Sequence, residues 1–306
     1  MDNIQNFYHN PVMLEECLQG LNIREGGVYV DVTFGGGGHS KAILKKIGSE
    51  GKVIAFDQDE DAKRNLVEGD SRFSFVQSNF KFLSNWLRYC GVYGEVDGIL
   101  ADLGVSSHQF DEKERGFSFR ENTRLDMRMN QSSSLSAYEV INQYEEEKLA
   151  NLMYLHGELH SSKKIARSIV EKRKEKSIET TMDLVQVVKP FISPKQEKKE
   201  LAMLFQSIRI EVNRELEALK SMLLQTLDCL KPQGRLVVMT YHSLEDRLVK
   251  NFMHYGNFEG KEEKDFFGKV HTPWTLLDRK VQTPSQEEIE LNPRSRSAKL
   301  RIVEKK

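Results

Sequence analysis

The sequence has only three cysteines, Cys17, Cys90 and Cys229, and they lie far apart along the chain. No two of them have the close spacing of a metal-binding motif, and so few cysteines do not suggest a disulfide framework. We therefore expect reduced thiols, as in cytoplasmic proteins, and no metal site.

Long apolar runs are also missing. A membrane-spanning helix needs about 20 consecutive apolar residues, and no stretch of this chain approaches that length. The first ten residues, MDNIQNFYHN, are polar and do not resemble a signal peptide. We expect a cytoplasmic protein without a membrane partner.

Neither sign of charge is in excess, because 45 Lys and Arg residues face 46 Asp and Glu residues and the formal net charge is −1. Any contact with RNA must therefore come from local basic patches. Residues 163–176 contain seven basic and two acidic side chains, and residues 294–306 contain six and one. A solvated helix face is the simplest interpretation of the first patch. In the second, the cations between small residues in PRSRSAKLR are more typical of phosphate contacts.

The most distinctive stretch is Val28–Ser40, VYVDVTFGGGGHS. Alternating β-branched residues predict a short strand, four glycines follow, and His39 and Ser40 open a segment with the apolar spacing of a helix. This is the beginning of a nucleotide-binding βαβ unit, because glycine lets the backbone approach a ligand and the first helical turn offers unpaired N–H groups.

The spacing of the glycines narrows the choice of nucleotide. The dinucleotide fingerprint needs a third glycine where this chain has Ser40 or Lys41, which argues against an NAD(P)-dependent oxidoreductase. The pattern acid-x-small-x-Gly-x-Gly, which begins with Asp31 and Thr33, resembles the loop of S-adenosylmethionine-dependent methyltransferases. That cofactor has no phosphate, so Asp31 can face its sulfonium or ammonium group. The alternative is an ordinary glycine-rich turn.

Acidic residues also end two later predicted strands. The second strand, KVIAFD, ends at Asp57, about 20 residues after the loop, where a carboxylate can accept hydrogen bonds from both ribose hydroxyls. The fourth, VDGILADL, has Asp102 near its end. Because the carboxyl ends of parallel strands lie at one edge of a sheet, we expect Asp31, Asp57 and Asp102 to converge.

Further candidates follow three of the predicted strands. Phe80, after RFSFVQ, can stack on adenine, although a core position is an equally good interpretation. Asp102 stands where a group that orients an amine acceptor should lie. After RLVVMTY, His242 is a candidate for a substrate contact, whereas Ser243 and Asp246 resemble a helix capping box.

The alternation of strands and helices stops near Phe110. About 100 residues of helical pattern follow, which is too long for a connection inside a compact domain. We therefore predict a discontinuous α/β domain, residues 1–109 and 212–306, with a parallel sheet and a last antiparallel strand, KLRIV. An all-helical domain, residues 110–211, is inserted in it, and one long helical region covers Glu197–Leu230.

Several stretches, spread over nearly the whole chain, are similar to one family, the 16S ribosomal RNA cytosine-N4 methyltransferases known as RsmH or MraW. These long and idiosyncratic stretches are HNPVMLEE, DVTFGGGGHS, ADLGVSSHQFD, ERGFSF, LDMRM, FQSIRIEVNREL, YHSLEDRLVK and NPRSRSAKLR. The resemblance implies a Rossmann-like class I methyltransferase sheet and an inserted helical domain that helps to bind substrate. It also implies N4-methylation of a specific cytidine in the decoding centre of the small ribosomal subunit.

The resemblance further implies a set of residues that contact S-adenosylmethionine: Gly37, Gly38, His39, Asp57, Phe80, Asp102 and Gln109. Departures from the family are mild, and none removes a polar group: His108 replaces a usual Pro, Ala101 a frequent Leu and Tyr241 a usual Phe. The family does not settle the catalytic residue, for which Asp102, as the group that orients the amine, and His242 are the candidates.

Two functions from different classes are compatible with these features. An enzyme that acts on 16S rRNA in the small subunit is favoured, because the loop glycines and the acids at the strand ends are all present. The alternative is a non-catalytic ribosome-assembly protein that binds RNA with a methyltransferase fold. A homodimer is compatible with either function.

Overall fold

The computed structural model describes residues 11–262, 264, 266, 272–278 and 280–306. The chain divides into two compact units. The first joins Met1–Gly104 to Leu216–Lys306, and the second is Val105–Glu215. The bounds of the second unit lie within five residues of the predicted insertion, 110–211.

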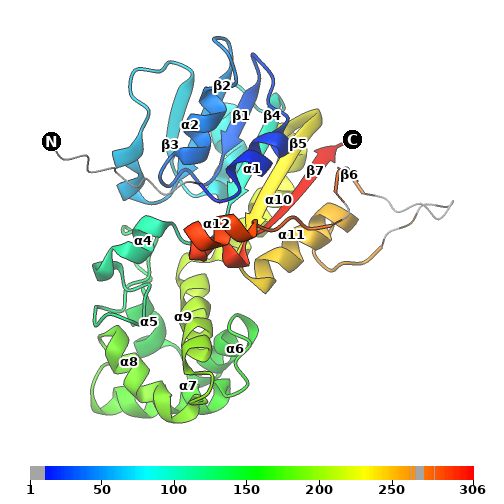
Figure 1. Ribbon diagram of the computed structural model, residues 1–306. Helices are drawn as coiled ribbons and strands as arrows, with labels where there is room; N and C mark the ends of the chain where they lie inside the picture. Colours follow the sequence, from blue (N-terminus) through cyan, green and yellow to red (C-terminus); the bar gives the residue numbers. More distant parts are fainter. Residues whose placement is uncertain (1–10, 263, 265, 267–271, 279) are drawn as a thin grey trace. The chain divides into compact units, whose positions relative to one another are not determined.

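The first unit is built on a seven-stranded sheet with the order β3-β2-β1-β4-β5-β7-β6 (Figure 1). Strands β1 to β5 run parallel, whereas β7 is antiparallel to β5 and β6. The predicted α/β fold with an antiparallel last strand is confirmed. The strands are β1 (Val28–Asp31), β2 (Lys52–Asp57), β3 (Phe73–Gln77), β4 (Val96–Asp102), β5 (Leu230–Thr240), β6 (Trp274–Leu276) and β7 (Lys299–Lys305).

The strand order reverses at β1, which has β2 on one side and β4 on the other. In open parallel sheets, ligands bind beyond the carboxyl ends of the strands at such a switch point. Asp31 pairs in register with Ala55 of β2 and Leu100 of β4. The loop after β1 therefore begins between the ends of β2 and β4, where Asp57 and Asp102 lie.

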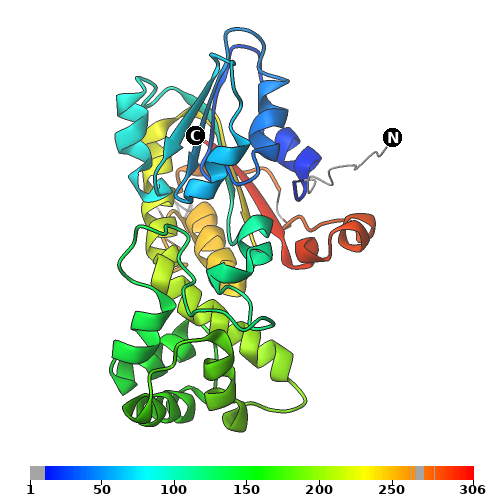
Figure 2. The ribbon, with the colours of Figure 1, turned by 90° about the vertical axis from the view of Figure 1, so that its left-hand side faces the viewer.

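Helices cover both faces of the sheet, as the burial of parallel strands requires. One set of strand side chains, Tyr29, Val53 and Leu100 among them, packs in a cluster with α1 (Leu14–Leu21) and α2 (Gly38–Leu44). The neighbouring side chains, including Val30, Ile54 and Ile99, point the other way and pack with α3 (Leu83–Tyr89), α10 (Glu215–Cys229) and α11 (Ser243–Tyr255). Figure 2 shows this unit from the side, with the blue helices α1 and α2 on one side of the sheet.

Strand β6 does not appear in the sequence-based prediction. Its three residues are too few to show an alternating pattern. Trp274 is 1% exposed, and its ring packs against that of Phe252 in α11, with 5.8 Å between the ring centroids. Tertiary packing therefore holds this strand at the sheet edge. The other short elements of this unit are η1 (Glu60–Asn65), η2 (Phe80–Phe82), α12 (Gln286–Leu291) and η5 (Pro293–Ser297).

The second unit consists of helices around their own apolar core, which includes Leu149, Met153, Ile165, Leu184 and Phe205. Its elements are α4 (Ser107–Asp111), η3 (Lys113–Arg115), α5 (Ala137–Gln143), α6 (Glu146–Leu155), α7 (Ser162–Glu175), α8 (Thr181–Val188), η4 (Lys189–Phe191) and α9 (Glu197–Asn213). Across the described residues of both units, no helix is long and apolar enough to cross a membrane.

The sequence predicts one helical region over Glu197–Leu230, whereas the structure divides it between α9 and α10. Arg214, at the break, has a left-handed φ of 48°. The Asn213 side chain accepts a hydrogen bond of 2.7 Å from the Met129 amide and donates one of 2.8 Å to the Met127 carbonyl. The end of α9 is therefore fixed by contacts with a loop more than eighty positions earlier in the chain.

Candidate functional site

Asp31, at the end of β1, is 1% exposed and holds the glycine loop together. Its Oδ2 accepts a hydrogen bond of 2.6 Å from the Ser40 hydroxyl in α2, and its Oδ1 accepts one of 3.1 Å from the Thr33 amide. Both ends of the loop are thus fixed to one buried carboxylate. The sequence suggests that this acid can face the cofactor, but in the structure its oxygens bind the loop itself.

Thr33 stands where the methyltransferase pattern usually has its first glycine. Its hydroxyl oxygen accepts a hydrogen bond of 2.7 Å from the Asp102 amide. The same hydroxyl lies 3.4 Å from Oδ1 of Asp31, to which it can donate. Thr33 therefore connects the loop after β1 to the end of β4, a contact that a glycine cannot make.

The first and third glycines of the loop are required by the path of the backbone. Gly35 and Gly37 have positive φ values of 49° and 74°, which residues with a side chain rarely adopt. In addition, a Cβ at Gly37 would lie 2.8 Å from the ring of Phe34. These two glycines therefore form the turn itself.

The second and fourth glycines, Gly36 and Gly38, differ in the space around their Cα atoms. A Cβ at Gly38 would lie 2.3 Å from Cγ of Pro11, so the segment Pro11–Met13, which we call the N-terminal strap, needs a glycine at the start of α2. A Cβ at Gly36 would have no atom within 4 Å. Gly36 is therefore on the open side of the loop, where a ligand can approach the backbone closely.

Asp57 ends β2 beside this loop. Its Oδ2 accepts a hydrogen bond of 2.8 Å from the Gly35 amide, and its Oδ1 accepts one of 2.8 Å from the Asp59 amide. Burial raises the pKa of Asp57 to about 6, although these two hydrogen bonds act in the opposite direction. Each carboxylate oxygen has a second lone pair, so the half-buried side chain can still accept hydrogen bonds from a ligand.

Phe80 lies close to the end of β2 because the turn before it is tied there. The Ser78 amide donates to the Asp57 carbonyl at 2.9 Å, and the Asn79 side chain donates to the Gln58 side chain at 2.8 Å. The ring of Phe80 is half-buried. Phe80 packs against the core cluster that includes Val30 and Ile54, which fits the alternative of a core position, and its stacking on adenine stays a prediction.

Asp102 forms the polar centre at the end of β4, with 24% of its side chain exposed. The Tyr241 hydroxyl, at the end of the neighbouring strand β5, donates a hydrogen bond of 2.8 Å to its Oδ1. Burial raises the pKa of Asp102 to about 6, while His39 and the Tyr241 hydrogen bond act to lower it. Burial and the Asp102 charge raise the pKa of Tyr241 well above its usual value, so this hydroxyl stays a donor.

His39 opens α2 and is 6% exposed. Its Nε2 lies 3.2 Å from the Val12 carbonyl oxygen, which can only accept, so Nε2 carries the hydrogen. Its Nδ1 then points toward Asp102 and lies 4.0 Å from Oδ2. The N-terminal strap thus orients the imidazole against the Asp102 carboxylate.

The predicted capping box that starts at Ser243 is wrong by one residue. His242 is the N-cap of α11, and its Nδ1 accepts a hydrogen bond of 3.5 Å from the Glu245 amide. Glu245 in turn accepts one of 3.1 Å from the Tyr241 amide, and its Oε1 lies 3.1 Å from His242 Nε2. His242 therefore has a structural role at the helix start, and its contact with substrate stays a prediction.

Gln109, the remaining predicted cofactor contact, belongs to α4 of the second unit and is 5% exposed. Its side-chain oxygen accepts a hydrogen bond of 3.1 Å from the Ser106 amide, and the Ser106 hydroxyl accepts one of 3.2 Å from the Gln109 amide. This capping box begins α4. The structure thus gives Gln109 a helix-capping role, and its contact with the cofactor stays a prediction.

Sequence reasoning identified Asp57 and Asp102 as site candidates but missed their partners. Thr33 is noted only as a small residue, and Tyr241 only as a departure from a family pattern. The strand order could have indicated Tyr241, because a hydroxyl at the end of β5 lies beside the end of β4. The role of Thr33 has no signature in the local sequence.

A glycine turn between β1 and α2, with ionisable carboxylates at the ends of β2 and β4, defines an α/β protein that binds a nucleoside cofactor at its switch point. Residues 6–306 match the model of the MraW methylase family, and the chain belongs to this family. It is an S-adenosylmethionine-dependent methyltransferase, and its sheet is the Rossmann-like sheet of class I methyltransferases. The predicted family and cofactor are confirmed.

Curated relatives match over the full length of the chain. The ribosomal RNA small subunit methyltransferase H of Parabacteroides distasonis is 59% identical over 305 residues and that of Phocaeicola vulgatus 58% identical over 306, each match covering 100% of both chains. Among solved structures, an rRNA methylase from Streptococcus thermophilus is similar with a TM-score of 0.42 and 12% identity, over 96% of this chain and 94% of that one.

Gly38→Ala and Gly36→Ala form a matched pair that separates packing from ligand binding. An alanine at position 38 would press on Pro11, so we expect a loss of stability of about 1–3 kcal/mol, as for other overpacked sites. An alanine at position 36 meets no protein atom, so we expect the free protein to keep its stability within about 0.5 kcal/mol. Its methyl group would instead obstruct the cofactor.

Thermal unfolding of both free variants, and calorimetric titration of each with S-adenosylhomocysteine, measure the two effects. Gly36→Ala should bind the ligand more weakly than the wild type at an unchanged melting temperature. Unchanged affinity in this variant would contradict the placement of the cofactor on the open side of the loop. A melting temperature for Gly38→Ala equal to that of the wild type would contradict the packing against the N-terminal strap.

Proposed function

We propose that this methyltransferase transfers a methyl group to N4 of a specific cytidine in the decoding centre of 16S rRNA. The observation that carries the proposal is the partly exposed Asp102 carboxylate at the end of β4, which is ionisable near neutral pH and fixed by Tyr241. The curated relatives named small subunit rRNA methyltransferases support the class of substrate. The stretches ADLGVSSHQFD and YHSLEDRLVK, which contain Asp102 and its partner Tyr241, support the choice of N4 through their resemblance to the cytosine-N4 family.

The side chains of the first unit fit S-adenosylmethionine. Gly36 leaves the loop open to a ligand, and Gly37 gives the backbone the turn that the loop needs. Asp57 has lone pairs left for the ribose hydroxyls, and Phe80 has an exposed part of its ring for the adenine. The cofactor, when bound, supplies a methyl group on a positively charged sulfur, so that a C–N bond forms while the C–S bond breaks.

Asp102 has two tasks in this proposal. The N4 amino group is a weak nucleophile that must be held in line with the methyl group, and a carboxylate oxygen that accepts a hydrogen bond from N4–H fixes its orientation. After the new C–N bond forms, N4 carries one proton too many. A carboxylate whose pKa is raised to about 6 can accept that proton and release it to water near neutral pH.

Tyr241 and His39 position this carboxylate. The Tyr241 hydroxyl occupies one lone pair of Oδ1, and the His39 ring lies on the side of Oδ2. The carboxylate is therefore fixed by the Tyr241 hydroxyl and bordered by the His39 ring at 4.0 Å, while part of it remains exposed to a substrate. We place the catalytic role on Asp102 and keep His242, which caps α11, as a candidate substrate contact.

The remaining assignments follow from the same proposal. Gln109 and the helical insertion would contribute to binding of cofactor and substrate, and the reaction would take place in the cytoplasm, where the small subunit is assembled. A homodimer stays compatible with this function. No membrane or metal enters the proposed reaction, because methyl transfer from a sulfonium needs alignment and exclusion of water rather than a Lewis acid.

Incubation with radiolabelled S-adenosylmethionine and small subunits that lack the modification tests the proposed function directly. We expect label in 16S rRNA, on N4 of a single cytidine, as determined by nuclease digestion and mass spectrometry of the nucleosides. Label on carbon 5 would contradict the choice of atom. Tight binding to subunits without any label would favour the non-catalytic assembly protein instead.

The affinity for S-adenosylhomocysteine should depend on the ionisation of Asp57. Because the pKa of Asp57 is raised to about 6, its carboxyl group gains a proton as the pH falls through 6 and loses acceptor capacity for the ribose hydroxyls. Calorimetry at pH 5 and pH 8 should therefore show weaker binding at the lower pH. Asp57→Ala should cost about 1.5–3 kcal/mol of binding free energy at pH 8 and reduce the pH dependence to the contribution of Asp102. Unchanged affinity in this variant would contradict the assignment.

The turnover number kcat, measured at saturating cofactor, should depend on the ionisation of Asp102. The ionised form accepts N4–H, so kcat should fall as the pH drops below about 6. Asp102→Asn should lower kcat by about 100-fold or more, as expected for a lost proton acceptor. Tyr241→Phe removes a donor that stabilises the ionised carboxylate, so the acidic limb of the profile should move to higher pH.

Tyr255→Phe, at the C-terminal end of α11, is the matched control for the Tyr241 variant. It removes a hydroxyl from the same unit without touching Asp102, and its pH profile should coincide with that of the wild type. A Tyr241→Phe profile that also coincides with the wild type would show that this hydroxyl does not act on the Asp102 carboxylate.

A further inference from the structure

The second unit contains a groove between α7 and α8 that the proposed reaction does not use. It has a volume of about 250 Å³ and is lined by Ser168, Lys172, Lys176, Ile178, Gln186 and Val187, which we call the α7–α8 groove. Lys172 and Gln186 at its rim are exposed, whereas Ile178 at its floor is 2% exposed. The groove is smaller than the pockets of about 300–1,000 Å³ that usually enclose small ligands.

The walls of the groove are fixed by hydrogen bonds. The Ser168 hydroxyl of α7 donates to the Val187 carbonyl of α8 at 3.3 Å. The Ile178 amide donates to Oδ1 of Asn142 at 3.0 Å, and the Asn142 side chain donates back to the Ile178 carbonyl at 2.9 Å. The floor is thereby anchored to α5. A ligand would meet a preformed site and would not have to order it.

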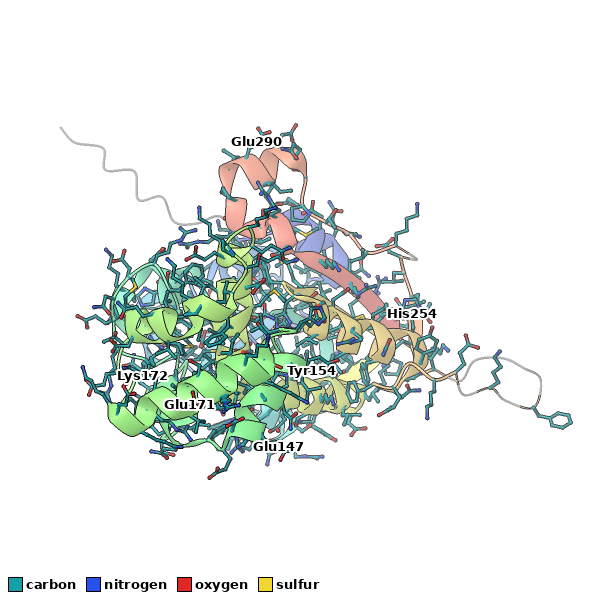
Figure 3. The ribbon with its side chains drawn as sticks, turned by 90° about the horizontal axis from the view of Figure 1, so that it is seen from below. Glu147, Tyr154, Glu171, Lys172, His254 and Glu290 are labelled. Atoms are coloured by element: carbon teal, nitrogen blue, oxygen red, sulfur yellow. The ribbon has the colours of Figure 1, made fainter. Side chains whose placement is uncertain are left out.

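Helix α7, which forms one wall of the groove, carries an excess of positive charge, with seven basic and two acidic side chains between residues 163 and 176. Of these side chains, Lys172 and Lys176 line the groove, and Asp183 of α8 lines it as well. The two acids of α7 form solvent-exposed pairs, Glu171 with Arg167 at 3.0 Å and Glu175 with Lys172 at 2.7 Å. Each exposed ion pair of this kind contributes at most about 1 kcal/mol to stability. An anion that binds here can therefore take the place of the acid in the pair. Figure 3 shows Glu171 and Lys172 at the surface of this unit.

The remaining lysines of residues 163–176 differ from Lys172, which pairs with Glu175, although the charge of Lys176 attracts that of Asp183. Lys163, Lys164, Lys174 and Lys176 form no ion pair with any residue in the described parts of the chain. The carboxylate of Asp183, which also borders the groove, accepts hydrogen bonds from the Thr180 amide at 3.0 Å and the Glu179 amide at 3.3 Å. Burial acts to raise the pKa of Asp183, but these hydrogen bonds and the charge of Lys176 lower it, so its charge is shared between the start of α8 and Lys176.

The chemistry of the groove suits a nucleotide chain. Lys172 lies in the last turn of α7, and Lys176 is the extended C-cap residue, whose amide donates to the Lys172 carbonyl at 3.2 Å. Both lysines line the groove, so they can contact neighbouring phosphates. The Gln186 amide and the Ser168 and Ser177 hydroxyls border the same space and can bind ribose hydroxyls. Val187 and Ile178 offer an apolar surface for the sugar or base. An acidic peptide would use the lysines but would not need this row of ribose-binding groups.

We propose that the α7–α8 groove binds the sugar–phosphate backbone of RNA, with Lys172 and Lys176 each contacting one phosphate. The inference rests on the proposed function in one respect, because rRNA is the RNA that this enzyme would meet. It assigns a binding surface that lies wholly within the second unit. If the proposal is correct, loss of Lys172 and Lys176 lowers the affinity for RNA. The affinity for the cofactor and the rate of methyl transfer do not change.

The test compares two double variants of the full-length protein. Lys172→Ala with Lys176→Ala removes both phosphate contacts. Lys195→Ala with Lys198→Ala is the matched control, because it removes two exposed lysines without an ion pair from the same unit, outside the groove. Each protein is saturated with S-adenosylhomocysteine, so no turnover occurs, and binding of an unmodified 16S rRNA transcript is measured by filter retention at several KCl concentrations.

We expect the groove variant to bind the transcript about tenfold more weakly than the control near physiological salt. The plot of log affinity against log salt should be less steep by about 1.4–1.8, since each phosphate contact contributes about 0.7–0.9 to that slope. Gln186→Glu, which adds a negative charge to the rim and keeps the size of the side chain, should also weaken binding. Melting temperature and affinity for S-adenosylhomocysteine should stay at wild-type values in all variants.

Two results would overturn the proposal: a groove variant that binds the transcript as tightly as the control, or a wild type that does not bind the transcript. Mapping of the methylated position separates this inference from the proposed function. If the label is not on cytidine N4 while binding still depends on Lys172 and Lys176, the proposed function fails and the binding surface stands.

Discussion

The hydrogen bond from the Asp102 amide to the Thr33 hydroxyl is the contact on which the site depends. It joins the loop after β1 to the end of β4, and the same hydroxyl lies beside the buried Asp31 carboxylate that also holds Ser40. The turn, the start of α2 and the end of β4 are therefore one connected unit. Without this connection, the Asp102 carboxylate and the glycine loop could move independently, whereas methyl transfer requires alignment to within fractions of an ångström.

Two carboxylates at this edge of the sheet, Asp57 and Asp102, have raised pKa values. Asp57 and Asp102 are both desolvated by the strands and loops around them, and burial brings the pKa of each to about 6. Their surroundings nevertheless differ. Asp57 accepts hydrogen bonds from two backbone amides, whereas Asp102 accepts one from a tyrosine hydroxyl and lies near an imidazole. These surroundings are the basis for proposing that Asp57 binds the cofactor and that Asp102 accepts the proton.

Local patterns predicted the strands, the glycine turn, and Asp57 and Asp102 at their strand ends, because β-branched alternation and turn glycines act over a few residues. They could not predict contacts that join distant segments. The pair of Thr33 and Asp102 is 69 positions apart, and that of Tyr241 and Asp102 is 139 apart. Strand β6 depends on Trp274 packing against Phe252, and the break at Arg214 coincides with contacts that Asn213 makes to a distant loop. Neither the packing of Trp274 nor the contacts of Asn213 produce a periodic pattern in the sequence.

The fourth glycine shows how far such long-range contacts extend. Its position suggests a cofactor contact, yet its missing side chain accommodates Pro11, and the neighbouring Val12 carbonyl orients His39. Met13, which completes the N-terminal strap, has a left-handed φ of 49°, and its amide donates a 2.8 Å hydrogen bond to Glu288 in α12. A carboxylate near the end of the chain therefore holds the strap that aims the His39 imidazole at Asp102. The surroundings of Asp102 therefore depend on the N-terminal strap and α12 as well as on the sheet.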